Sequence, residues 1–137
     1  MDDIMAFVQR DRFARHVGIE LLEVGKGWAK AQLALRPHHL NGVHTAHGGA
    51  IFALADLAFA AASNSHGTVA VGINASISYV KAASEGTLTA EAQETSCGPR
   101  LATYTVRVTD DTGDLVAIFQ GMVYRKKEPI LSEDGKN

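Results

Sequence analysis

The sequence lacks a pair of cysteines. Cys97 is the single cysteine among 137 residues, so a disulfide within the chain is excluded. The absence of disulfides is typical of proteins that fold in a reducing compartment, and we therefore expect a cytoplasmic protein. No internal repeat or low-complexity block stands out.

Positive charge is not in excess either. Thirteen Lys and Arg stand against fifteen Asp and Glu, which gives a net charge of -2 at pH 7. Proteins that bind nucleic acids usually carry a basic surface, so no nucleic-acid partner is expected. The chain begins with two aspartates, Asp2 and Asp3, where a signal peptide is basic, and the first 16 residues contain no long apolar run, so we expect no targeting segment.

The composition is otherwise that of a globular protein. Hydrophobic residues make up 46% of the chain, enough for one domain with a sizeable core. We expect a single domain over residues 1–127, whose first 16 residues hold a short amphipathic helix at 2–15. Residues 128–137 are polar with little to bury, which predicts a disordered tail.

The apolar stretch from His47 to Ser65 predicts a central helix. It opens with two glycines and contains seven alanines. Its apolar residues fall on every side of a helical wheel, so we expect a helix that is buried all round. With a rise of about 1.5 Å per residue it falls short of a bilayer core of about 30 Å, and no membrane partner is expected.

Asp56 is the single charge in the middle of that helix. A carboxylate among apolar residues must find partners or change its pKa. One interpretation is a structural acid that is hydrogen-bonded or paired and inert. The other is a base or nucleophile, held beside the N-terminus of its own helix or of a neighbouring one.

Six further segments alternate between apolar and polar residues with the period of a β-strand. They are residues 18–24, 28–36, 69–81, 86–96, 100–110 and 114–125. Short turns at Gly98-Pro99 and at 110–113 separate the last three, which predicts an antiparallel meander. A curved antiparallel sheet would cover most of the central helix, and a partner subunit would cover the rest.

The loop before the central helix is dense in histidine. Its four histidines raise the hypothesis of a metal site, but their spacing matches no usual zinc pattern and no cysteine lies nearby, so we expect no metal. We expect His38 and His39 in a solvated loop. His47 differs because it precedes Gly48-Gly49, whose uncovered N–H groups at a helix start favour an anion or the oxyanion of a polarised carbonyl.

Several short motifs together resemble a known family. They are Asn41-Gly42, His47-Gly48-Gly49, Asp56 seven residues after the second glycine, the segment from Asn74 to Tyr79, Gly98-Pro99-Arg100 and Gln120-Gly121. Over about residues 17–125 the sequence resembles the hotdog-fold acyl-CoA thioesterases, specifically the phenylacetate-degradation thioesterase subfamily. The resemblance implies an α+β hotdog fold, in which a curved antiparallel sheet wraps around a long central helix.

The resemblance also implies roles for four residues. Asn41 helps to position the thioester and the nucleophile, and the backbone N–H of Gly48 polarises the thioester carbonyl. His47 lies beside the thioester, and Asp56 activates water or attacks the carbonyl itself. Such enzymes use no metal and no cofactor, since coenzyme A is part of the acyl-CoA substrate.

The quaternary structure that the resemblance implies is a homodimer, usually paired into a homotetramer. Its active sites lie at the dimer interface, where Asp56 of one subunit faces Asn41 and Gly48 of the other. Helix geometry favours this arrangement, because two turns separate Asp56 from the start of its own helix.

The strand after the helix departs from the family pattern. Some relatives place Ser or Thr near the position of Gly72 to hold the water, and here Asn74, Ser76 or Ser78 would substitute. We therefore expect Asn74 and Ser76, together with Gly49, to bind substrate.

The phosphates of coenzyme A need cationic partners. Many relatives follow the aromatic residue of that strand with a basic residue and a proline, and this chain keeps Lys81 but lacks the proline. Lys81, Arg100 and Arg125 are the candidates, with ordinary solvated charges as the alternative for each.

We predict the hydrolysis of an acyl-CoA thioester with an aryl or medium acyl group. A non-catalytic acyl-CoA sensor on the same fold is one alternative, but it would not need Asp56. A hotdog dehydratase is another, although its chemistry usually requires a catalytic His and an acid in a different arrangement. A purely structural interaction module would not need a charge inside a buried helix.

Overall fold

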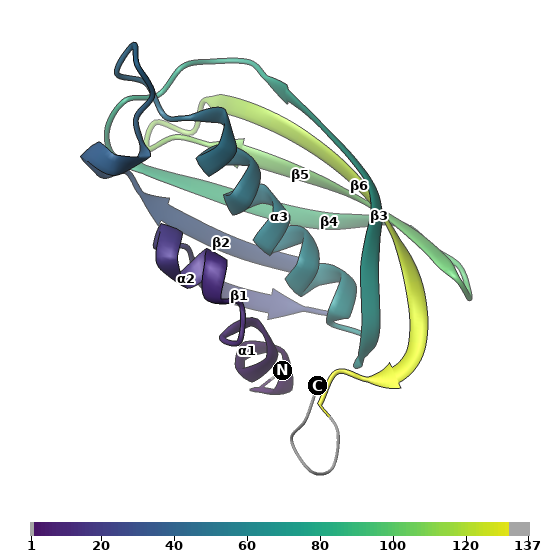
Figure 1. Ribbon diagram of the computed structural model, residues 1–137. Coiled ribbons are helices and arrows are strands. Elements are labelled where there is room, and N and C mark those ends of the chain that lie inside the picture. The colour runs from purple at the N-terminus through teal and green to yellow at the C-terminus, as the bar shows by residue number, and fades with distance from the viewer. Residues whose placement is uncertain (1, 132–137) are drawn as a thin grey trace.

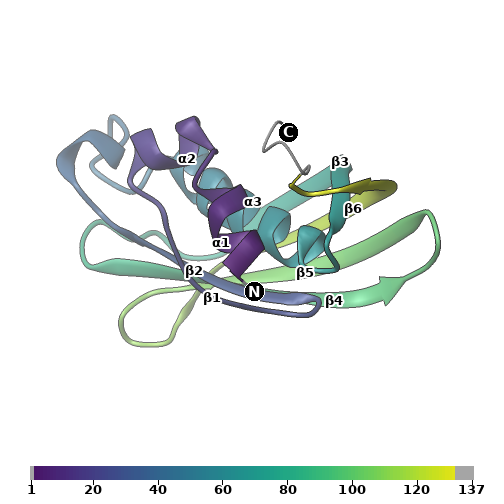
Figure 2. The same cartoon turned by 90° about the horizontal axis from the view of Figure 1, so that it is seen from below.

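The computed structural model describes residues 2–131 and contains one six-stranded antiparallel sheet that curves around a helix (Figures 1 and 2). The strand order is β1-β2-β4-β5-β6-β3. The helices are α1 (Asp2–Val8), α2 (Arg12–Val17) and α3 (Gly48–Asn64), with a short 3-10 turn at Pro37–His39. The strands are β1 (Glu20–Gly25), β2 (Trp28–Ala34), β3 (Thr68–Tyr79), β4 (Thr87–Cys97), β5 (Leu101–Thr109) and β6 (Leu115–Pro129).

Helix α3 packs on the concave face of the sheet, where it contacts every strand. Small residues on its inner side allow this close approach, and Ala55, Ala58 and Ala62 are fully buried. The predicted α+β arrangement of a curved sheet around a central helix is therefore confirmed. Among the described residues, no helix is both long and apolar enough to cross a bilayer.

The strands bury alternate residues, as their sequence pattern predicts. On β2 the side chains of Ala29, Ala31 and Leu33 face the core, and β4 and β5 follow the same period. Strands β4, β5 and β6 form the predicted meander, and β3 pairs with β6 at the edge of the sheet.

A glycine on β6 makes room for Phe59, one of the two phenylalanines of α3. A Cβ on Gly121 would lie 2.7 Å from two ring atoms of Phe59. The Phe59 ring packs in turn against Phe119 and Tyr104, with ring centroids 5.3 Å and 5.7 Å away. Gly121 thus allows the sheet and the helix to approach each other at this point.

The N-terminal prediction of one helix at 2–15 is wrong. The chain forms two short helices, because the Asp11 carboxylate accepts a hydrogen bond from the Ala14 N–H at 2.9 Å and starts α2 as its N-cap. Helix α2 ends at Gly18, which adopts the left-handed conformation with φ 100°.

The C-terminal boundary predicted at residue 128 is too early. Strand β6 continues to Pro129, and Ile130 is only 3% exposed, so residues 128–131 belong to the folded domain. The remainder of the predicted tail, 132–137, lies outside the described residues.

Candidate active site

The loop before α3 is held together by the side chain of Asn41. Its Oδ1 accepts hydrogen bonds from the N–H groups of Val43 and Thr45, and its Nδ2 donates to the Thr45 hydroxyl at 3.0 Å. The Asn41 N–H donates to the Thr45 carbonyl at 2.8 Å and closes the turn. The side-chain amide of Asn41 thus stabilises the conformation of this loop, which holds Asn41 close to the start of α3.

The predicted solvated loop is wrong for His39, which is buried. Its Nδ1 accepts from the Arg36 N–H at 2.9 Å, and its Nε2 lies 2.6 Å from the Val17 carbonyl. The His39 carbonyl accepts the His47 N–H at 2.8 Å. His39 therefore links the end of α2 to the residue that begins α3.

His47 is the N-cap of α3 and shapes its first turn. Its Nδ1 accepts the Gly49 N–H at 2.8 Å, so the neutral ring carries its proton on Nε2. The His47 carbonyl accepts the N–H groups of Ala50 and Ile51. Within residues 2–131, the Gly48 N–H is left without a hydrogen-bond acceptor. The helix start thus offers one uncommitted backbone donor at the positive end of the helix dipole.

Tyr79, at the end of β3, packs against this helix start. Its hydroxyl donates to the Gly48 carbonyl at 2.9 Å, and a Cβ on Gly48 would lie 3.1 Å from the tyrosine ring. Only a residue without a side chain fits under the ring without displacing it. The sequence shows Tyr79 only as an aromatic strand residue, and nothing in its pattern signals this contact with Gly48.

A groove of about 310 Å³ brings several predicted residues together. Asn41, Gly48 and Lys81 line it together with Tyr79 and Ile51. His47 and Gly49 line a neighbouring groove of about 300 Å³ beside α2. Asp56 lines neither groove, so one chain does not bring the predicted acid to the predicted carbonyl site.

Asp56 lies on the one side of α3 that the sheet leaves uncovered. Gly49 and Asp56 are exposed on this side, and Phe52, Ala53 and Ala60 are only partly buried. The prediction of a helix that is buried all round is therefore wrong for a single chain. The pattern does not show this, because apart from Asp56 these residues are as small or apolar as those that face the sheet.

The pKa of Asp56 is raised above its ordinary value of 3.8. The first cause is the loss of water around the carboxylate, since the neighbouring groups are apolar, and the second is the like charge of Asp11 on the N-cap of α2. Its side chain still reaches solvent in the single chain. Asp56 is thus an accessible carboxylate with enhanced basicity, as a general base requires.

The predicted phosphate contacts differ in their surroundings. The Lys81 ammonium donates to Asp110 at 2.7 Å and to Asp114 at 2.8 Å, so two carboxylates already compensate its charge. Arg100 is exposed and lines a wide groove of about 660 Å³ together with Arg125 and two lysines, Lys126 and Lys127. The denser cationic surface therefore lies around Arg100.

Asn74 and Ser76 do not line the groove that contains Asn41 and Gly48. Strand β3 has a bulge between Gly72 and Asn74. Gly72 pairs with buried Val123, whereas Ser76 pairs with exposed Gln120, so the strand changes faces at the bulge. Both side chains point away from α3, and they cannot hold a water at the Gly48 carbonyl site of their own chain.

The fold and the helix start define a class of protein, a hotdog domain with a donor-bearing glycine at the start of its central helix. Residues 44–117 match the profile of the thioesterase superfamily. The chain is 34% identical to the acyl-coenzyme A thioesterase PaaI of Escherichia coli, over 93% of this chain and 92% of that protein. It is 45% identical to a protein of Archaeoglobus fulgidus, over 88% of this chain and 79% of the relative.

Solved structures agree with the sequence comparison. The structure of the E. coli PaaI protein from the phenylacetic acid degradation operon matches with a TM-score of 0.89 and 31% identity, and covers 93% of this chain and 94% of that one. A Streptococcus mutans protein bound to acetyl CoA matches with a TM-score of 0.78 and 26% identity, over 82% and 91% of the two chains. This chain belongs to the thioesterase superfamily. The resemblance to the phenylacetate-degradation thioesterases and the prediction of a thioester hydrolase are confirmed.

Proposed function

We propose that this protein hydrolyses an acyl-CoA thioester with an aryl or medium acyl group to the free acid and coenzyme A. The observation that carries the proposal is the uncommitted N–H of Gly48 at the start of α3, beside Asn41 in one groove. Membership of the thioesterase superfamily and the likeness to an acyl-coenzyme A thioesterase support the substrate class.

In the proposed mechanism, the thioester carbonyl accepts a hydrogen bond from the Gly48 N–H. This donor stabilises the oxyanion as the carbonyl is attacked, and one such donor contributes about 3 kcal/mol to the transition state. Asp56 removes a proton from water or attacks the carbonyl itself. Asn41 positions the thioester, and the His47 Nε2–H lies at the edge of the same helix start.

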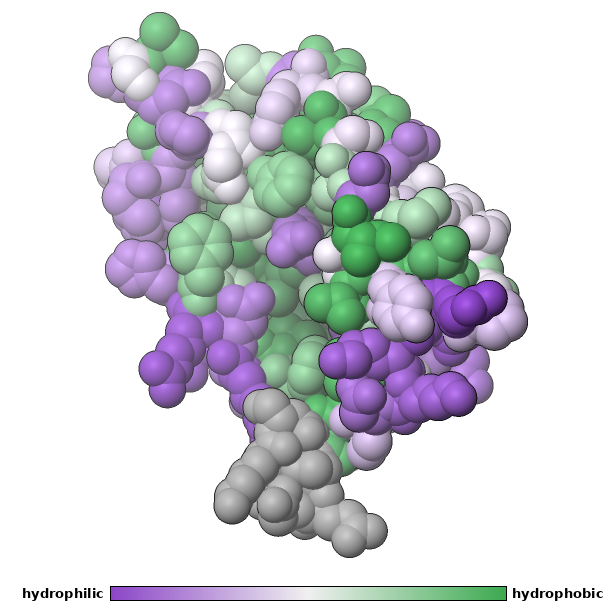
Figure 3. All heavy atoms as spheres, turned by 45° about the vertical axis from the view of Figure 1, so that its right-hand side comes forward, coloured by the Kyte–Doolittle hydropathy of each residue, from purple (hydrophilic) through white to green (hydrophobic). Residues whose placement is uncertain are grey.

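Asp56 reaches this carbonyl from a second copy of the chain. Strand β3 is an edge of the sheet, and its Val71 and Ile73 are 46% and 55% exposed. Figure 3 shows apolar residues gathered on the side of the molecule where β3 lies. A second copy that pairs along β3 would cover this edge and the open side of α3 together. Pairing of two such dimers into a tetramer stays a prediction.

Arg100 is the better candidate for the phosphates of coenzyme A. It faces a groove that is rich in cations, and the guanidinium of Arg125 is fixed there by a 2.7 Å bond to the Gly98 carbonyl. Lys81 lies closer to Gly48 but is engaged by two carboxylates. A phosphate would have to compete with Asp110 and Asp114 for Lys81.

Release of free thiol across a panel of acyl-CoA substrates tests the proposed function. We expect turnover with aryl and medium-chain acyl-CoA and little with short or very long acyl groups. Enoyl-CoA hydration in the same panel would indicate a dehydratase. Tight acyl-CoA binding without thiol release would indicate a sensor.

Hydrolysis should not depend on a metal. The proposed roles at Asn41, Gly48 and Asp56 involve only a backbone donor, an amide and a carboxylate, which complete the reaction with water. Activity should be unchanged after dialysis against a strong chelator, measured by thiol release. Loss of activity that zinc or manganese restores would contradict the proposed chemistry.

The charge of Asp11 should tune the pH dependence of hydrolysis. Asp56 acts as a base only when ionised, so activity falls as the pH drops through its raised pKa. Asp11→Asn removes the like charge that helps to raise this pKa, so the acidic limb of the kcat/KM profile should move to lower pH. Asparagine keeps the N-cap bond to Ala14, so the fold should be retained.

Asp3→Asn is the matched control, because it removes the same charge from neighbouring α1. Asp3 is not among the groups that act on the Asp56 carboxylate. Its profile should coincide with that of the unmodified protein. If Asp11→Asn and Asp3→Asn move the acidic limb equally, the effect of Asp11 is one of net charge and not of proximity.

A further inference from the structure

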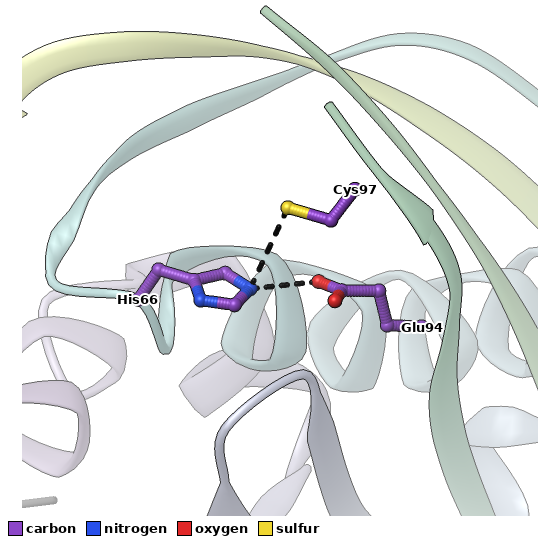
Figure 4. Close-up of side chains that lie close together, drawn as sticks. All are labelled: His66, Glu94 and Cys97. Atoms are coloured by element: carbon purple, nitrogen blue, oxygen red, sulfur yellow. Dashed lines mark hydrogen bonds and ion pairs between the residues drawn. The ribbon is translucent and has the colours of Figure 1, made fainter. Parts of the chain in front are cut away.

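Three potential metal ligands converge at the end of α3 that lies opposite the Gly48 groove. His66 follows α3, and Glu94 and Cys97 come from the end of β4. Figure 4 shows the three side chains pointing toward one another. His66 Nε2 lies 2.7 Å from Glu94 Oε2 and 3.9 Å from Cys97 Sγ, and the three ligand atoms all lie within 4.8 Å of one another.

A β-bulge creates this convergence. In a regular strand Glu94 and Cys97, three residues apart, would face opposite sides of the sheet. The register of β4 shifts between Glu94 and Ser96, so that Glu94 pairs with Tyr104 and Cys97 with Ala102, both of which are buried. The extra residue therefore turns Cys97 to the same side as Glu94.

The arrangement is not that of a nucleophilic triad. In a triad the histidine uses one ring nitrogen for the nucleophile and the other for the acid. Here the same nitrogen, Nε2, faces both the thiol and the carboxylate. Three different ligand atoms directed at one point form the geometry of metal coordination.

We propose that His66, Glu94 and Cys97 bind a zinc-like divalent transition-metal ion. The nitrogen, oxygen and sulfur donors suit such an ion, and the two anionic ligands, a carboxylate and a thiolate, balance its charge. Cys97 is exposed, so a solvent molecule can complete a tetrahedral site as the fourth ligand.

The distances fit after small side-chain movements. Tetrahedral zinc places N and O ligands about 3.4 Å apart, and S about 3.6 Å from either. The His66–Glu94 separation must therefore lengthen from 2.7 Å by about 0.7 Å, and the Cys97–His66 separation must shorten from 3.9 Å by about 0.3 Å. Rotations about the side-chain bonds of exposed Cys97 and half-buried His66 can supply these changes.

The surroundings already hold the ligands in place. The Tyr104 hydroxyl donates to Glu94 Oε2 at 2.5 Å, a bond that orients a ligating carboxylate. The Glu94 N–H donates to the Gly27 carbonyl at 2.8 Å, and the Gly27 N–H donates to the hydroxyl of Ser65 at 2.7 Å. These bonds connect the β1–β2 turn to the residue before His66 and to Glu94.

The site is separate from the proposed catalytic groups. Helix α3 has 17 residues and is therefore about 25 Å long, with Gly48 at one end and His66 just beyond the other. A metal here would tie the end of α3 to β4 without reaching the thioester. Metal binding and metal-free hydrolysis are thus independent properties of the chain.

Calorimetric titration of the full chain with zinc alone, after removal of bound metal by a chelator, tests the proposal. We expect one zinc ion per chain and release of a proton, because the Cys97 thiol ionises on binding. His66→Ala, Glu94→Gln and Cys97→Ser should each weaken binding more than about a hundredfold, since even a partner of a ligand affects affinity by about 10- to 100-fold. Tyr104→Phe should weaken it within that smaller range.

His38→Ala is the matched control, as it removes an exposed histidine elsewhere and should bind zinc normally. Cobalt gives a second readout that does not depend on folding energetics. The wild type should show a thiolate-to-cobalt charge-transfer band, and Cys97→Ser, an exposed and nearly isosteric change, should lose it. Absence of saturable zinc binding by the wild type, or binding that survives both His66→Ala and Cys97→Ser, would overturn the proposal.

Discussion

Asp56→Asn is expected to lower kcat by at least about a hundredfold, the low end for loss of a general base. The amide has the size of the carboxylate but cannot accept a proton from water or attack a carbonyl. The loss should appear in kcat for every acyl-CoA that the protein turns over. Steady-state thiol release on the best substrate of the panel measures it.

The fold should survive this substitution. The pKa of Asp56 is higher in the folded chain than its ordinary 3.8, so the folded state favours the protonated carboxyl. As the pH rises from the ordinary pKa of Asp56 through its raised pKa in the folded chain, ionisation of the carboxyl lowers the free energy of unfolding. A neutral amide at this position avoids that loss of stability at pH 7. Thermal unfolding of Asp56→Asn at pH 7 should occur at or above the temperature of the unmodified protein.

Asp3→Asn serves again as the control with the same chemical change, and it should keep normal turnover. If Asp56→Asn also keeps near-normal turnover, Asp56 is a structural acid and the proposed mechanism fails. An inactive variant that is also unfolded would instead assign Asp56 a role in stability. The thermal measurement therefore separates the two interpretations.

The sequence predicts the elements of this fold well because their patterns are strong. The apolar stretch from His47 to Ser65 contains all of α3, and the strand boundaries from β1 to β5 agree with the alternation within about two residues. The sequence pattern does not predict the break between α1 and α2, although the side chain of Asp11 is a typical N-cap. The amphipathic pattern continues across that break and conceals it.

The bulges on β3 and β4 explain why the sequence pattern does not predict which side chains meet at the two sites. In a regular strand, Asn74 and Ser76 would point to the same face of the sheet as Gly72, which faces α3. They would then lie near the substrate, as predicted. The bulge after Gly72 reverses this face. The bulge after Glu94 likewise brings Cys97 to His66. A bulge depends on pairing between distant strands, and it changes which residues meet without a local signal.

The open side of α3 has a different origin. Helical periodicity shows which residues are apolar, but it does not show whether the chain itself or another copy covers them. The pattern therefore predicts that this side of α3 is buried, whereas in the single chain Asp56 is exposed and Phe52 and Ala60 are only partly buried. The side of α3 that carries Asp56 and the exposed residues of β3 are the surfaces that a second copy would cover.

Mixing two inactive variants should restore activity, which tests the shared active site. Asp56 lies about 12 Å along the helix axis from Gly48, whereas the groups that act on one carbonyl must approach it to about 3 Å. Asn41 lies with Gly48 in a groove that Asp56 does not line. In a two-fold dimer, each helix can present its start to the middle of the other. Asn41→Ala and Asp56→Ala should therefore each be nearly inactive as homodimers.

The two variants are unfolded together in equal amounts and refolded, and native mass spectrometry measures the fraction of mixed dimers. Random pairing makes about half of the dimers mixed. Each mixed dimer has one site with both substitutions and one with neither, so activity should return to about a quarter of the unmodified protein. Each variant refolded alone is the control for recovery. If the mixture stays as inactive as its components although mixed dimers are present, Asn41 and Asp56 serve one site from the same chain, and the active site does not cross the interface.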